Sequence, residues 1–334
     1  MYYKDLLRHR QAWLGAALLW IILFHLPIGV GPLGYPKAIG YGGVDICFFA
    51  SGIGCYYSLT SDSDIGNFMK RRLKRLMPTY SIFIIGWLAT KYISGEFDIQ
   101  MALGNLLALQ HFSGHANSFN WYIGAALLFY FFAPYFKMVV DRSSPVCKYL
   151  FPFFLFLCSV PFWQADIQII TVSRLPIFYI GMLFANMCQQ SKRISAPHVF
   201  YAVLSFIVGM LSLRIFFKCF PQHLWSYGLY WYPFIFITPP LCMAISYLLI
   251  LMERLNFTRP VVSFLSLCGE YSFELYLIHI LLISLISDLI KQLNLTNFGD
   301  FIWIAGIVPL FAGCFILRRL TLLFNRLHQR IRRA

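Results

Sequence analysis

The chain alternates between long apolar runs and short basic segments. Ten runs are long enough to cross a hydrocarbon layer of about 30 Å at about 1.5 Å per residue. They cover residues 12–30, 39–59, 78–95, 119–140, 148–163, 168–188, 197–217, 228–252, 264–290 and 301–320. A shorter run, 101–112, fits an interfacial or re-entrant segment better than a crossing. The pattern predicts an all-α, polytopic membrane protein with about ten transmembrane helices.

The basic residues predict how these helices are oriented. With the N-terminus in the cytoplasm, the segments on the cytoplasmic side hold 21 of the 27 Lys and Arg residues, as the positive-inside rule requires. The most basic of these segments are the loop 60–77 and the tail 318–334. We therefore expect both termini in the cytoplasm. Because no polar stretch is long enough for a further globular domain, residues 1–334 form a single transmembrane domain.

Composition supports a membrane protein and excludes other classes. The chain is 59% hydrophobic and 12% charged, with a mean hydropathy of +0.68, whereas about a quarter of the residues of a soluble protein are charged. The net charge of +14 follows from the basic cytoplasmic loops and does not indicate a nucleic-acid partner. The nine cysteines are scattered through apolar segments without a CxxC pair, so we expect neither a metal site nor a disulfide framework.

Two ionisable residues interrupt the first two apolar runs. His25 and Asp45 lie at a similar predicted depth, toward the outer ends of adjacent helices. A lone aspartate inside a bilayer costs roughly 2.5–3.5 kcal/mol on insertion scales, so Asp45 needs a partner, and His25 is a candidate. A carboxylate beside an imidazole fixes its tautomer and raises its basicity. The alternative is a buried polar pair that only holds two helices together.

Arg174 and His279 interrupt two later runs. The predicted orientation of the helices places both residues in the outer half of the membrane. Ionisable residues are rare inside a bilayer and usually mark a functional site. We therefore expect His25, Asp45, Arg174 and His279 to surround one cavity that leans outward.

The basic loop carries the segment FMKRRLKRLMP. If the loop is helical, Arg75 stands four residues after Arg71 and three after Arg72, so that one face presents several guanidinium groups. Guanidinium groups bind phosphate groups bidentately. The alternative is a juxtamembrane patch that binds anionic lipids.

Five motifs taken together resemble a known family. LFH at His25, GVDICFFASG, RRLKRLMP, RLPIFYIGMLFA and GEYSFELYLIH occur in the order seen in the acyltransferase 3 family of bacterial membrane O-acyltransferases, which modify surface and exported glycans. The resemblance implies an acyl-CoA donor bound from the cytoplasm, a sugar hydroxyl as acceptor on the outer side, and a location in the bacterial cytoplasmic (inner) membrane. It assigns catalysis to His25 and the donor phosphates to the basic loop.

Two positions depart from the family pattern and indicate a divergent member. Relatives that modify O-antigen usually carry an arginine eleven residues before the first-helix histidine, where this chain has Leu14. They also tend to carry a glutamate soon after the tryptophan of the fourth span, where this chain has Ala125 and Ala126.

The residues themselves are compatible with acyl transfer. Taking the hydroxyl proton requires a general base, and a positioned base is worth about 10²–10⁴ in rate; His25 fits this role. Arg174 or His279 could stabilise the oxyanion. Ser51 could carry the acyl group covalently, although a small residue there more often serves helix packing. The alternative class is a secondary transporter or flippase that uses Asp45, Arg174 and His279 as a relay.

Overall fold

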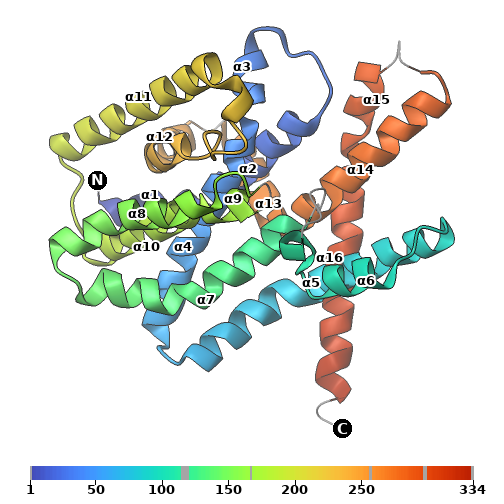
Figure 1. The fold of residues 1–334 in the computed structure, drawn as a ribbon, viewed down its shortest axis with the longest axis horizontal. Coiled ribbons are helices and arrows are strands. Elements are labelled where there is room, and N and C mark those ends of the chain that lie inside the picture. The colour runs from blue at the N-terminus through green and yellow to red at the C-terminus, as the bar shows by residue number, and fades with distance from the viewer. Residues whose placement is uncertain (1, 114–119, 166–167, 256–257, 296–298, 332–334) are drawn as a thin grey trace.

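The computed structural model describes residues 2–113, 120–165, 168–255, 258–295 and 299–331, and Figure 1 shows their arrangement. Secondary structure in these ranges is helical apart from one isolated bridge between Tyr2 and Arg193. The all-α prediction is therefore confirmed. The last residues of the predicted basic tail and the first of the predicted span 119–140 lie outside the described ranges.

The N-terminal half contains short helices between longer ones. Its elements are α1 (Tyr3–Leu6), η1 (Leu7–His9), α2 (Arg10–His25), η2 (Gly31–Leu33), α3 (Gly34–Ala38), η3 (Gly40–Gly42), α4 (Gly43–Ser61), α5 (Ile65–Ile93), α6 (Ile99–Leu106), η4 (Gln110–Ser113), α7 (Trp121–Arg142) and α8 (Pro145–Ser159). The run 101–112 falls on α6 and η4, which are too short to cross a bilayer.

The C-terminal half also contains short helices between longer ones. Its elements are η5 (Val160–Phe162), α9 (Gln168–Val172), α10 (Leu175–Gln189), α11 (Ala196–Cys219), η6 (Pro221–His223), α12 (Pro233–Glu253), α13 (Arg259–Glu270), α14 (Ser272–Gln292), α15 (Gly299–Ala305) and α16 (Ile307–Ile331). The C-terminal part of α16 extends beyond the other helices (Figure 1).

Within the described ranges, seven helices are long and apolar enough to cross a membrane, or eight if the bent pair Gly31–Ala38 and Gly40–Ser61 is one span. The seven are Trp121–Arg142, Pro145–Phe162, Gln168–Gln189, Ala196–Cys219, Pro233–Glu253, Ser272–Gln292 and Phe301–Leu327. The protein is thus a multi-pass membrane protein. The predicted spans 12–30 and 78–95 fall on α2 and the second half of α5, which are not among these helices.

Three predicted spans are interrupted within the predicted run. The run 12–30 is not one helix, because α2 ends at His25 and Leu26 is extended (φ −70°, ψ 127°), the conformation that the following Pro27 favours. The run 168–188 breaks before α10, at Arg174. The run 264–290 breaks at Tyr271 (φ −95°, ψ 14°), between α13 and α14.

Glycine residues permit two close helix crossings in the core. A Cβ on Gly52 of α4 would lie 2.1 Å from the carbonyl oxygen of Phe178, and Gly181 of α10 faces α4 in the same way. Gly15 on α2 and Gly269 on α13 form a second crossing of this kind. Because only glycine permits such backbone approach, these pairs fix how α2, α4 and α10 lie against their neighbours.

Burial separates central helices from peripheral ones. The span Gln168–Gln189 is 78% buried within the protein, whereas Pro145–Phe162 and Ala196–Cys219 are each 11% buried. Figure 1 places α11 at the edge of the helix assembly. α8 and α11 thus carry exposed apolar side chains, as helices at the edge of a membrane protein do.

Candidate active site

A cavity of about 120 Å³ lies among α2, α4, α5, α7 and the start of α14. Along α2 its wall is formed by Arg10, Leu14, Leu18 and Ile21, whose spacing places them on one face of the helix. That face is about 16 Å long. His25 follows Ile21 by one turn, so the cavity, which we call the shaft, runs along α2 toward His25.

Arginines line one end of the shaft. Arg72 and Arg75, both predicted from the basic loop, line it together with Arg10. Arg72 is buried and donates a hydrogen bond to the carbonyl oxygen of Gly54. Arg10 was not predicted as a site residue, because sequence gives no sign that the start of α2 lies beside the basic stretch of α5.

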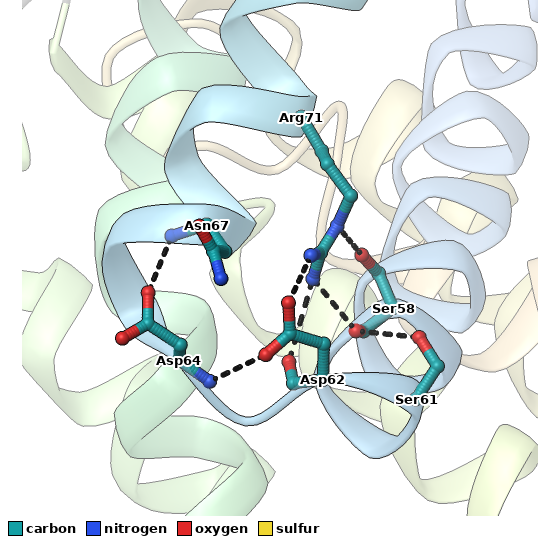
Figure 2. A network of polar contacts seen from close by, with 6 residues as sticks. All are labelled: Ser58, Ser61, Asp62, Asp64, Asn67 and Arg71. Carbon is teal, nitrogen blue, oxygen red and sulfur yellow. Dashed lines mark hydrogen bonds and ion pairs between the residues drawn. The ribbon is translucent and has the colours of Figure 1, made fainter.

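Arg71, the third predicted phosphate-binding arginine, does not line the shaft. Figure 2 shows its guanidinium group turned to the loop between α4 and α5, where Nη1 lies 2.5 Å from Asp62 Oδ2 and Nη2 donates to the carbonyl oxygen of Ser58 at 3.1 Å. In the same loop Asp64 accepts a hydrogen bond from Asn67 N and caps α5. The hydrogen bond from Arg71 lowers the pKa of Asp62 below its ordinary value.

We expect Arg71→Ala to loosen this loop. Amide protection at residues 62–64 should fall roughly two- to fivefold at neutral pH, because an exposed ion pair contributes little. Since the pKa of Asp62 is lowered in the folded protein, the pair is intact at neutral pH and is lost as the pH falls through that pKa. The difference from wild type should therefore vanish in acid.

Hydrogen exchange measured by mass spectrometry at both pH values tests this. The exposed Lys70 on the same helix provides a matched control, Lys70→Ala, which should leave the loop unchanged. Equal loop protection in wild type and Arg71→Ala at neutral pH would contradict the prediction.

Two histidines lie beyond the other end of the shaft. His25 is the last residue of α2 and is exposed, whereas His279 on α14 is buried. Their ring centroids are 5.4 Å apart. His279 Nδ1 lies 2.7 Å from the carbonyl oxygen of Tyr276, so in a neutral ring Nδ1 carries the proton. Its Nε2 is then a free acceptor, with no hydrogen-bond partner among the described residues.

Two tyrosines separate the shaft from this histidine pair. Tyr122 and Tyr276 both line the shaft, and their ring centroids are 4.9 Å apart. The ring of Tyr276 lies 5.9 Å from that of His279. The shaft is thus bounded by aromatic rings where it approaches the histidines. Among the described residues, no group of three or more His, Cys, Asp and Glu residues is arranged to hold a metal ion.

Asp45 and Arg174 form a buried ion pair with an Oδ1–Nε distance of 3.4 Å. Arg174 Nη1 also donates to the carbonyl oxygen of Ile170 at 2.6 Å. The guanidinium carbon lies 5.1 and 5.0 Å from the ring centroids of Trp121 and Trp231. Arg174 is therefore held on several sides by an anion, a carbonyl and two aromatic faces.

His25, the candidate partner that the sequence offers for Asp45, is not paired with it. The ion partner of Asp45 is Arg174, and no hydrogen bond or ion pair joins Asp45 to His25 in the described part of the chain. The four predicted residues form two pairs, His25 with His279 and Asp45 with Arg174, in place of a single cluster.

One family model matches most of the chain. The family model of the acyltransferase domain, Acyl_transf_3, matches residues 15–319. The chain belongs to this family, and it is therefore a membrane acyltransferase. No curated protein and no solved structure matches the chain. Because the match covers nearly the whole chain, family membership favours acyl transfer over the transporter alternative.

Proposed function

We propose that the protein transfers an acetyl or other short acyl group from cytoplasmic acyl-CoA to a hydroxyl group of a cell-surface or exported glycan. The observation that carries the proposal is the shaft, which has arginines at one end and runs along α2 toward His25. An acyl-CoA needs cations for its phosphates, a narrow passage for its pantetheine arm and a base where the thioester meets the acceptor. A transporter needs no such combination.

The proposal includes a topology. The protein lies in the bacterial cytoplasmic membrane with about ten crossings and both termini in the cytoplasm, so α2 and the second half of α5 are also spans. Arg10 and His25 are then about 22 Å apart along α2, on opposite sides of the membrane. The positions of the basic loops support this orientation, and the lipid-facing α8 and α11 are the main contacts with membrane lipids.

In the proposed reaction His25 is the general base. It takes the proton of the acceptor hydroxyl as the oxygen attacks the thioester carbonyl carbon. The carbon–sulfur bond then breaks, and the proton passes from His25 to the CoA thiolate. His25 is exposed and can meet an acceptor from outside. His279 lies behind it with Nε2 free, which allows it to accept a hydrogen bond from the ring of His25 and orient the base.

We assign Asp45 and Arg174 a positioning role. The Arg174 guanidinium group is already engaged by Asp45 and Ile170 and lies between two tryptophans. An oxyanion donor would need N–H groups directed at the reacting carbonyl. The pair instead holds the start of α4 to the break before α10, beside aromatic faces that suit a sugar acceptor.

The test compares surface glycans from a strain that lacks the gene with those from the same strain carrying it. Mass spectrometry should reveal an acyl mass increment only when the gene is present, and mild base should remove it because the bond is an ester. Isotopically labelled acyl-CoA supplied to inverted membrane vesicles should deliver its label to the glycan. Unchanged glycan masses, together with an altered distribution of an unmodified solute, would favour the transporter instead.

A further inference from the structure

Arg10 stands at the start of α2, where the shaft has its arginine end. A Cβ placed on Gly54 would lie 3.6 Å from Arg10 Nη1 and 3.7 Å from Arg72 Nη1. The two guanidinium groups therefore approach the same point of the α4 backbone. Arg75 lines the same end of the shaft from α5. Three cations from two helices thus converge on one opening.

The protein compensates these charges in part, because the carboxylate of the buried Glu274 on α14 interacts electrostatically with Arg75. The residues that line the shaft include no Asp or Glu. In the described part of the chain neither Arg10 nor Arg75 makes a hydrogen bond or an ion pair, and Nε of the buried Arg72 has no partner. Like charges gathered in a partly buried site repel one another unless an anion joins them. The three guanidinium groups thus form a site whose charge suits an anionic ligand.

We propose that Arg10 is the third phosphate-binding residue of the donor site, and that the three guanidinium groups select a donor bearing a diphosphate. A CoA thioester carries a 5′-diphosphate and a ribose phosphate, whereas an acyl-carrier protein presents its pantetheine arm through one phosphodiester. Three guanidinium groups, each able to bind a phosphate bidentately, match the phosphate groups of CoA in number. They outnumber the one phosphodiester of the acyl-carrier protein. The inference rests on the proposed function and names its donor class.

Arg10 also lies close to Leu14, one of the two positions at which the chain departs from the family pattern. Leu14 lies one turn along α2 from Arg10, and both line the shaft. Arg10, like Leu14, precedes the residues 15–319 that the family model matches. Arg10 places a positive charge on the same face of α2 as Leu14, which is uncharged.

The experiment measures ligand binding by calorimetry to the full-length protein in nanodiscs of zwitterionic lipid. The ligands are CoA and 4′-phosphopantetheine, and the variants are Arg10→Gln and Arg8→Gln. Arg8 is the matched control because it is exposed and pairs with Glu253 at 3.1 Å. We expect Arg10→Gln to weaken CoA binding about tenfold and 4′-phosphopantetheine binding less than about threefold. Arg8→Gln should stay within about twofold of wild type.

Each outcome decides a separate point. If wild type binds CoA and Arg10→Gln behaves like Arg8→Gln, Arg10 has no role in the donor site. If Arg10→Gln weakens both ligands equally, the selection of a diphosphate is overturned. If wild type binds neither ligand, the proposed donor itself fails. Should Arg10→Gln not fold, Arg10→Lys keeps one charge but loses the fork, and an intermediate loss of CoA affinity is expected.

Discussion

Replacing His25 with alanine is expected to lower the rate of acyl transfer by about 10²–10⁴, the usual contribution of a positioned general base. Abundance in the membrane should stay close to that of wild type. His25 is exposed and ends α2, so its removal creates no cavity in the core. The measurement is the initial rate of label transfer from acyl-CoA to the acceptor in membrane vesicles, normalised to the amount of protein.

His223→Ala is the control for this experiment. His223 lies in η6, far along the chain, where its ring contacts Tyr227 at 5.1 Å between centroids. We expect this variant to retain the wild-type rate within about twofold. A His25→Ala rate within about threefold of wild type would remove His25 from the mechanism and leave His279, with its free Nε2, as the remaining base.

The sequence predicted an all-helical, multi-pass membrane protein because a chain that crosses lipid needs long apolar runs. The ends of helices within such runs were harder to place, since hydropathy alone does not distinguish a bent run from a straight one. Two local signals were nevertheless present. Pro27 favours an end to α2 just before it, and Pro176 suits the first turn of α10, which begins after Arg174.

These breaks matter because they carry the polar residues. His25 ends α2, Asp45 lies in the first turn of α4, and Arg174 precedes α10. A depth estimate from sequence placed all three in the same layer, but it treated them as interior helix positions. Chain breaks in a membrane protein free backbone groups that polar side chains can satisfy, as Arg174 does for the carbonyl oxygen of Ile170.

Pairing between helices could not be predicted from one sequence. The ion pair of Asp45 joins residues 129 positions apart on the chain, and Arg10 meets Arg72 only because α2 and α5 both pack beside α4. The depth of a residue in the membrane does not show which other helix lies beside it. For that reason the sequence predicted Arg72, Arg75 and the four ionisable residues of the apolar runs as site residues, but not their partners.

Separating Asp45 from Arg174 is expected to destabilise the fold strongly. Each side chain is about 1% exposed, and removing one member of a buried ion pair costs about 3–5 kcal/mol because the other charge is left uncompensated. Asp45→Asn and Arg174→Met should each lower the thermal unfolding midpoint of the detergent-solubilised protein and reduce its abundance in the membrane.

The double variant, Asp45→Asn with Arg174→Met, tests whether the pair acts as a unit. It leaves no buried charge, so its loss of stability should be smaller than the sum of the two single losses. Additive losses would mean that the two residues contribute independently. Activity per folded molecule then separates the roles: a positioning pair allows the double variant to retain more than background transfer, whereas an oxyanion role for Arg174 predicts that folded double variant is as inactive as His25→Ala. Measuring stability and activity on the same protein sample therefore decides whether the pair supports the structure of the site or takes part in the reaction.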